Sequence, residues 1–284
     1  MSIPVIEVPE AGPAVTWQEG EAQARRASAR HKRKRLAFLV AGWVVIFAVW
    51  QVAAYYLPFG TLPNPLEVGA EMWEIVASGA LVSDFLASVI KTFAGFGAAV
   101  LVGAPVGYLM GRYNYWRAFF RDGVTVAGTI PALTYAVLSL IIFGLSDLGP
   151  VLAVALVSTP YVALNVAEGI RGVDQNLVKM SQAFGRSPQM IRREVFLPTI
   201  VPYLFAAVRM SFAVAWKVEA LTEVFGGTNG VGFQIRTEYQ LFNITGVIAW
   251  MALFIVFMLL IERLLLRKLE KRVLAWRPEE RAAR

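Results

Sequence analysis

Four ionisable side chains lie in or beside one strongly apolar stretch of the chain, at residues 200–225. Placed on a helix at about 100° per residue, Arg209, Trp216, Glu219 and Glu223 fall on one stripe, together with Phe212. Lys217 lies well off that stripe. Ionisable groups at membrane depth cost free energy, and they usually face a cavity or a partner group.

Two interpretations of these residues stay open. All four ionisable residues could form structural pairs between helices or at a subunit interface. Alternatively, some of them could line a path for a solute, in which Lys217 would attract an anion such as a sulfonate. Trp216 fits either packing or a gate.

The residue types of the sequence offer little support for catalytic or metal-binding chemistry. The chain has no cysteine, and its one histidine, His31, lies in a basic run. We therefore predict no catalytic residue, no metal site and no disulfide. A phosphate-binding loop of the form Gly-x-x-x-x-Gly-Lys-Ser/Thr is missing, so we expect this chain to bind no nucleotide cofactor. The glycine-rich stretch from Gly226 to Gly232 lacks the lysine and hydroxyl, and we interpret it as a flexible turn.

The elements that carry these residues are predicted to be membrane-spanning helices. Hydrophobic residues make up 57% of the 284 residues, charged residues only 17%, and the mean hydropathy is +0.56. A span needs roughly 20 apolar residues. Six stretches qualify, and they cover residues 36–57, 85–110, 124–145, 148–167, 200–225 and 245–266. The third and fourth almost touch, but Pro131, Gly144 and Pro150 indicate breaks.

Lysine and arginine are concentrated in every other connection between the predicted spans. They are frequent before residue 36, at 112–121, at 168–199 and after 266, and they are scarce in the other loops. By the positive-inside rule, six spans place both termini in the cytoplasm. The basic residues that give the net charge of +7 therefore lie where membrane orientation requires them. For this reason we expect no nucleic-acid partner.

The predicted organisation has three parts. Residues 1–35 form a basic cytoplasmic tail, of which 1–30 should be loosely ordered. Residues 36–266 form the membrane domain, and residues 267–284 form a second basic cytoplasmic tail. Between the first two spans, residues 66–80 predict an interfacial helix.

The cytoplasmic connection between the fourth and fifth spans has the strongest local signal. It predicts two short helices, the first at residues 175–184 and ended by Gly185. Ser187 is a suitable N-cap for the second, with Pro188 at its first helical position. That helix should run to about Phe196. A helical hairpin exposed at the membrane face could dock into a groove of a partner.

This connection resembles the EAA loop of ABC importer permeases, over residues 169–198. Gly185, followed at the family's spacing by Val195 and Phe196 and then by Leu197 and Pro198, carries the likeness; Lys179-Met180-Ser181 stands where the family has Glu-Ala-Ala. Further segments, among them Ile130-Pro131-Ala132-Leu133 and Glu223-Val224-Phe225-Gly226-Gly227, resemble the nitrate/sulfonate/taurine branch. The similarity covers roughly residues 85–266. It implies that the ATPase-coupling residues are Lys179, Ser181, Ala183, Gly185, Ser187, Pro188, Arg192, Leu197 and Pro198.

The resemblance also implies an all-α fold, that of type I ABC importer permeases, in a bacterial inner membrane. Two permease copies would form the path, and each loop would rest on a separate ATPase subunit that binds ATP and magnesium. A periplasmic or lipoprotein solute-binding protein would deliver the substrate, and lipid would surround the complex.

Two other classes of membrane protein fit the sequence less well. A secondary transporter driven by an ion gradient often has internal repeats, and no convincing repeat relates the halves of this chain. A membrane enzyme would need a polar catalytic cluster, which the sequence does not offer. The sequence alone does not name the substrate.

Overall fold

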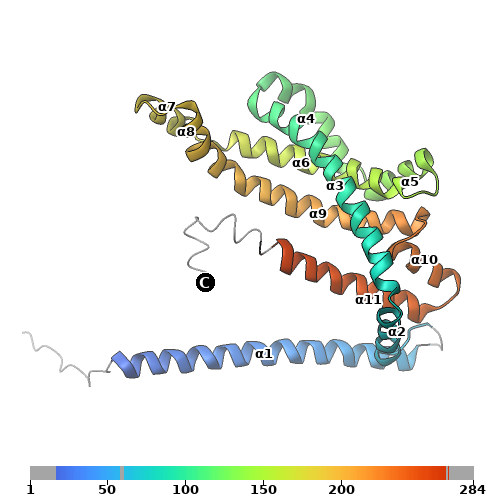
Figure 1. Ribbon diagram of the computed structural model, residues 1–284. Coiled ribbons are helices and arrows are strands. Elements are labelled where there is room, and N and C mark those ends of the chain that lie inside the picture. The colour runs from blue at the N-terminus through green and yellow to red at the C-terminus, as the bar shows by residue number, and fades with distance from the viewer. Residues whose placement is uncertain (1–16, 58–60, 267, 269–284) are drawn as a thin grey trace, which may run out of the picture. The chain divides into compact units, whose positions relative to one another are not determined.

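The computed structural model describes residues 17–57, 61–266 and 268, and this part of the chain is helical with no strand (Figure 1). The chain divides into two compact units, Met1–Pro65 and Leu66–Arg284, which are described separately.

The first unit consists of one long helix, α1 (Trp17–Tyr56), whose segment Lys34–Tyr56 is long and apolar enough to cross a membrane. The expectation of a loosely ordered tail up to residue 30 is wrong for residues 17–30, which continue the helix. Strong helix formers such as alanine, glutamate, glutamine and arginine dominate this stretch, which explains the extension. Residues 1–16 lie outside the described part. The Trp50 indole N–H donates to the Pro63 carbonyl oxygen at 3.1 Å and ties the end of this unit back to α1.

The second unit holds the remaining helices. Their bounds are α2 (Pro65–Ala77), α3 (Ala80–Arg112), α4 (Asn114–Thr129), α5 (Ala132–Phe143), α6 (Leu148–Arg171), α7 (Gln175–Ala183), α8 (Pro188–Ile191), the π-helix η1 (Arg192–Phe196), α9 (Leu197–Gly226), α10 (Val231–Gln240), α11 (Ile244–Ile261) and the π-helix η2 (Glu262–Leu266). The predicted helix at 66–80 is confirmed as α2, in which Val68 and Ile75 are buried. The predicted C-terminal tail lies outside the described residues apart from Lys268.

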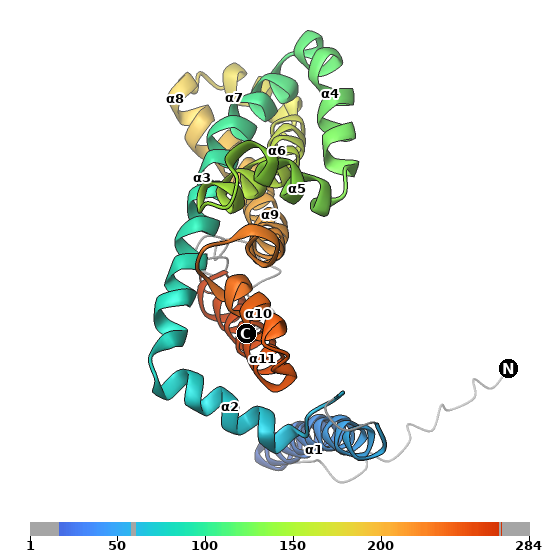
Figure 2. The ribbon, with the colours of Figure 1, turned by 90° about the vertical axis from the view of Figure 1, so that its right-hand side faces the viewer.

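Five of the predicted spans are single helices in the described part of the chain: Lys34–Tyr56, Ala80–Arg112, Leu148–Arg171, Ile244–Leu264 and the long helix Pro188–Gly226. The third predicted span is not one continuous helix. It is the pair α4 and α5, which meet at a bend of 94° (Figure 2). Pro131 lacks a backbone N–H and forces Ile130 into an extended conformation, with φ −64° and ψ 130°, so the helix cannot continue.

The predicted break between the third and fourth spans is confirmed. Gly144 ends α5 with a positive φ of 64°, and α6 begins at Leu148. Pro150 lies in the first turn of α6, where a missing N–H leaves no hydrogen bond unmade.

Small residues of α3 allow the backbone of this helix to lie directly against the backbone and side chains of α6. Gly95, Ala99, Gly103, Gly107 and Gly111 recur at every fourth position of α3. A methyl group added at Gly95 would lie 2.6 Å from the Val151 carbonyl oxygen, and one added at Gly103 would lie 2.8 Å from the Thr159 carbonyl oxygen. This spacing is the small-xxx-small pattern that allows membrane helices to approach closely.

Helix α9 packs on the other side of α6 in the same manner. The Tyr203 ring fills the space over Gly169 of α6 and over Gly172, which follows the last residue of this helix. Near the opposite end of α9, Gly226 accommodates Leu140 of α5. Between these contacts, Val218 of α9 packs in a buried cluster with Tyr135 and Val157. Helix α6 is therefore the centre of the unit, and α9 runs along it for most of its length.

Candidate functional site: a coupling loop and a buried charge cluster

The loop between α6 and α9 forms the two short helices that the sequence predicts. The Asp174 carboxylate caps α7 by accepting a hydrogen bond from the Asn176 amide at 2.8 Å. Gly185 follows α7 with φ 71°, a conformation that costs glycine little. Ser187 caps α8 by accepting from the Met190 amide at 3.3 Å, and Pro188 is its first residue. The predicted roles of Gly185, Ser187 and Pro188 are confirmed, and the cap from Asp174 adds to them.

The second short helix does not end before the span. It passes through one π-helical stretch, Arg192–Phe196, directly into α9, so that Pro188–Gly226 is a helix of 39 residues. Pro198 causes no break; it lies just after the π-helical stretch, where the backbone bonding pattern changes. A displacement at the loop can thus be carried along one helix to the opposite end of the unit.

The loop is fixed on one side and open on the other. Val178, Val195 and Phe196 pack against a buried cluster that includes Val173 and Ile200. The side chains of Leu177, Met180, Phe184, Met190 and Leu197 are exposed, with Phe184 at 76%. Of the predicted coupling residues, Ser181 and Pro198 are half-buried, and Lys179, Ala183, Gly185, Ser187, Pro188, Arg192 and Leu197 are exposed. Figure 1 shows α7 and α8 projecting at one end of the unit.

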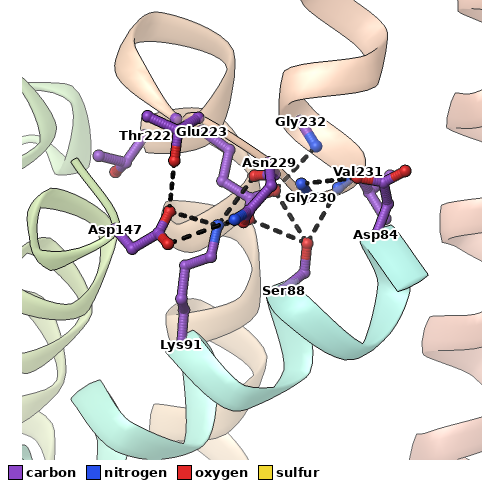
Figure 3. Close-up of polar contacts among 12 residues, drawn as sticks. Asp84, Ser88, Lys91, Asp147, Thr222, Glu223, Asn229, Gly230, Val231 and Gly232 are labelled. Atoms are coloured by element: carbon purple, nitrogen blue, oxygen red, sulfur yellow. Dashed lines mark hydrogen bonds and ion pairs between the residues drawn. The ribbon is translucent and has the colours of Figure 1, made fainter. Parts of the chain in front are cut away.

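At the other end of α9, Glu223 is completely buried and paired with Lys91 of α3. The Lys91 ammonium lies 2.6 Å from the Glu223 carboxylate, and the lysine side chain is only 6% exposed (Figure 3). Ser88 donates to the same carboxylate at 2.9 Å, and the Gly232 amide donates at 2.9 Å. The Glu223 carboxylate thus has both a counter-ion and hydrogen-bond donors, as a buried ion pair requires.

Lys91 also connects this carboxylate to the turn after α9 and to the turn before α6. Its ammonium donates to the Asn229 carbonyl oxygen at 2.8 Å and lies 3.5 Å from Asp147. Asp147 in turn accepts from Thr228 at 2.7 Å and from the Asn229 side chain at 3.2 Å. We call Asp84, Ser88, Lys91, Asp147, Glu223 and the 227–232 turn the charge cluster.

Asp147 is the exposed member of the charge cluster, with half of its side chain accessible. Partial burial acts to raise the pKa of its carboxyl group. Hydrogen bonds from Thr228 and Asn229 and the positive charge of Lys91 act in the opposite direction and dominate, so the pKa lies below its ordinary value. Asp147 is therefore ionised at neutral pH.

The glycine-rich turn, interpreted from the sequence as flexible, is instead held at several points. The Gly230 amide donates to Asp84 at 3.0 Å, and the Val231 amide donates to Ser88 at 3.0 Å. Gly230 has φ 104°, and a side chain there would collide with the Glu223 carboxylate. Glycine is needed at this position because the backbone wraps closely around a charged group.

The predicted stripe on α9 faces the protein interior over most of its length. Trp216 is fully buried and stacks with Phe254 and Phe257 of α11, at centroid distances of 5.6 and 6.5 Å. Glu219 is also fully buried, and neither of its oxygens has a hydrogen-bond partner among the described atoms. Arg209, at the N-terminal end of the stripe, lies 3.3 Å from Glu262 and is half-exposed.

Lys217 lies on a different face, as the helical spacing predicts, and its side chain is exposed. The structure thus brings Glu223 into the charge cluster and Trp216 into an aromatic core. It leaves Arg209 and Lys217 accessible.

Sequence reasoning missed Lys91, Ser88, Asp84 and Asp147. One signal was available, because Lys91 is the only charged residue in the apolar run 85–110. A lone lysine in a span indicates a buried acidic partner. Its partner lies 132 residues away in the chain, and only the packing of α3 beside α9 identifies it.

The fold and the loop together define the membrane-embedded subunit of a transporter. Residues 99–275 match the family described as the binding-protein-dependent transport system inner membrane component. The chain belongs to this family, and it is an ABC importer permease.

Relatives in three bacteria carry names from one branch of this family. A protein named as an aliphatic sulfonates transport permease of Bacillus subtilis is 27% identical and covers 82% of this chain and 85% of its own length. The taurine transport system permease protein of Escherichia coli is 26% identical, with coverages of 86% and 88%. The nitrate import permease protein of Synechococcus elongatus is 24% identical, with coverages of 69% and 74%.

Solved structures share the fold. The MetNI methionine ABC transporter, in an inward facing conformation, contains a chain with a TM-score of 0.58 and 20% identity; the match covers 68% of this chain and 96% of that one. A chain of an amino acid ABC transporter has a TM-score of 0.58 and 22% identity, with coverages of 70% and 96%. These matches support the type I importer fold predicted from the sequence.

Proposed function

We propose that this permease forms the translocation path of an ATP-driven importer for a small oxyanion and couples that path to a separate ATPase subunit. The observation that carries the proposal is the α7 part of the loop, which exposes apolar side chains although it lies outside the apolar spans. Leu177, Met180 and Phe184 would be unfavourable in water, and a protein partner that covers them explains their exposure.

The loop is built to transmit force as well as to bind. Its inner side is anchored on the cluster of Val173 and Ile200, and its outgoing helix is continuous with α9. ATP and magnesium would bind only to the partner ATPase. Closure of two ATPase subunits would move the loop, and α9 would carry the movement to the charge cluster.

The other partners follow from the importer class. We propose a second copy of this chain, a periplasmic or lipoprotein solute-binding protein, and membrane lipid as the surroundings. Both termini would lie in the cytoplasm, in agreement with the basic residues of the loop and tails.

The relatives support an oxyanion as substrate. Their names specify aliphatic sulfonates, taurine and nitrate, which all present an anionic oxygen group. Arg209 and Lys217 are the accessible cations of α9 that could meet such a group.

Co-purification tests the coupling role. In Gly185→Val, a β-branched residue would have to adopt φ 71°, which costs about 1–2 kcal/mol and would shift α7 relative to α8. We expect this variant to lose most of the ATPase that co-purifies with the permease, or to retain it without solute-stimulated ATP hydrolysis.

Gly123→Ala in α4 is the matched control, since a methyl group there meets no atom within 4 Å. This control should keep both the ATPase and the stimulation. Normal ATPase retention and normal stimulation in Gly185→Val would contradict the proposed role of the loop.

A further inference from the structure

One face of α9 is left open by the packing of the second unit. Its exposed residues recur at intervals of three or four, which places them on one side of the helix. They are Ala206, Arg209, Met210, Ala213 and Lys217, and the half-buried Ala220 and Val224 continue the row. We call this row the open face.

The open face has defined borders. On one side, Trp216 packs against Phe254 and Phe257 of α11. On the other side, Val218 packs with Tyr135 and Val157 of α5 and α6. The open face is therefore a strip between α11 and the α5–α6 pair, bordered by packed helices.

The charges on this face differ from those of the charge cluster. Arg209 is paired with Glu262 at 3.3 Å. Lys217 has no ion pair and no hydrogen bond to its side chain among the described residues. Within the described part of the chain, Lys217 is thus the cation of the open face without an ion pair, and apart from Arg209 the other residues of this face are uncharged.

Its depth makes contact with lipid unfavourable. Lys217 precedes the end of α9, Gly226, by nine residues, which corresponds to roughly 14 Å along the helix. Side chains on a helix lean toward its N-terminus, so the lysine points away from that nearer end. An exposed ammonium group at this depth is expected to face water or a partner rather than acyl chains.

We propose that the open face lines the water-filled translocation path and that Lys217 is the residue there that attracts the anionic group of the solute. This inference rests on the proposed function and deepens it, because it assigns the wall of the path and a residue that selects for negative charge. The small residues Ala206, Ala213 and Ala220 leave room beside the lysine for a solute to pass.

Charge-selective labelling of a cysteine tests the proposal. The natural chain contains no cysteine, so Ala213→Cys introduces a single thiol one helical turn from Lys217. The complete complex, in phosphatidylcholine proteoliposomes, is treated with a sulfonate-bearing methanethiosulfonate and, separately, with its trimethylammonium analogue. We expect the anionic reagent to react faster, and we expect Lys217→Gln in the same background to lower the ratio of the two rates by roughly threefold to tenfold.

Any effect of Lys217 on the ionisation of the thiol changes both rates by the same factor, because both reagents react with the same thiolate. This effect therefore cancels in the ratio of the two rates. Arg121→Gln in α4 is the matched control, as it removes one exposed charge elsewhere and should leave the ratio unchanged. Because the membrane is zwitterionic, an anionic lipid headgroup cannot be the source of the effect.

Two results would overturn the proposal: failure of both reagents to label the cysteine until the protein is denatured, or a rate ratio that Lys217→Gln does not change. The ATPase that co-purifies with each variant is measured in parallel. A complex that keeps its ATPase but gives either result refutes the assignment of the open face while leaving the importer function intact.

Discussion

Glu219 and Glu223 differ in environment although they lie one turn apart on α9 and are both fully buried. Glu223 is neutralised by Lys91 and accepts from Ser88 and the Gly232 amide. Glu219 has no donor among the described atoms. Loss of charge should therefore cost much more stability at Glu223 than at Glu219, because only Glu223 forms an ion pair with the buried Lys91.

Glu223→Gln is expected to destabilise the permease by about 3 kcal/mol or more, since it leaves the Lys91 charge buried without its closest counter-ion. Glu219→Gln breaks no ion pair among the described residues and should change stability by less than about 1 kcal/mol. The thermal unfolding midpoint of the purified complex in detergent measures both. Equal effects of the two substitutions would refute this distinction.

A double substitution separates charge balance from a need for these particular groups. Replacing Lys91 and Glu223 together by methionine removes both charges and keeps similar volume, which is often neutral for a buried pair. We expect Lys91→Met/Glu223→Met to recover most of the stability that Glu223→Gln loses. If stability recovers but transport does not, the pair has a role in the conformational cycle beyond folding.

At the scale of the elements, local signals predicted local structure well. Gly185, Ser187 and Pro188 act through local backbone conformation and bonds to near neighbours, so the end of α7 and the start of α8 could be predicted from the sequence. Pro131 likewise marked a break. The 94° angle at that break depends on how α4 and α5 pack on other helices, and no short segment contains that information.

Close packing of α3 on α6 predicts a contrast between two glycines of the same helix. Gly103→Ala would place a methyl group 2.8 Å from the Thr159 carbonyl oxygen, and the backbone has to move. We expect a loss of about 1–3 kcal/mol, seen as a lower unfolding midpoint. Gly97→Ala meets no atom within 4 Å and should leave the midpoint unchanged or raise it, because alanine favours helix. A similar loss in both variants would show that the α3–α6 contact is not the cause.

At the scale of the whole molecule, hydropathy predicted where five of the spans lie along the chain and that the bent pair α4–α5 is apolar, but not the pairing of residues between the helices. Lys91 meets Glu223 because α3 and α9 lie side by side at the charge cluster, which is a property of the tertiary packing. The loop at one end of α9 and the charge cluster at the other share a single helix. A permease that must respond to an event on one side of the membrane with a movement on the other side can use such a connection.

The bent pair α4–α5 decides the topology. If it crosses the membrane, the 113–115 turn and the 144–147 turn lie on opposite sides, and the loop of α7 and α8 is cytoplasmic. If it were re-entrant, both turns would lie on one side, and the loop after α6 would be placed outside, away from any ATPase. We therefore expect single cysteines at the exposed residues Tyr115 and Leu145 to react with an impermeant thiol reagent from opposite sides. In intact cells with the outer membrane permeabilised, Leu145→Cys should label, whereas Tyr115→Cys and Arg186→Cys should label only after the inner membrane is opened. Labelling of Tyr115→Cys and Leu145→Cys from the same side would exclude the six-span arrangement.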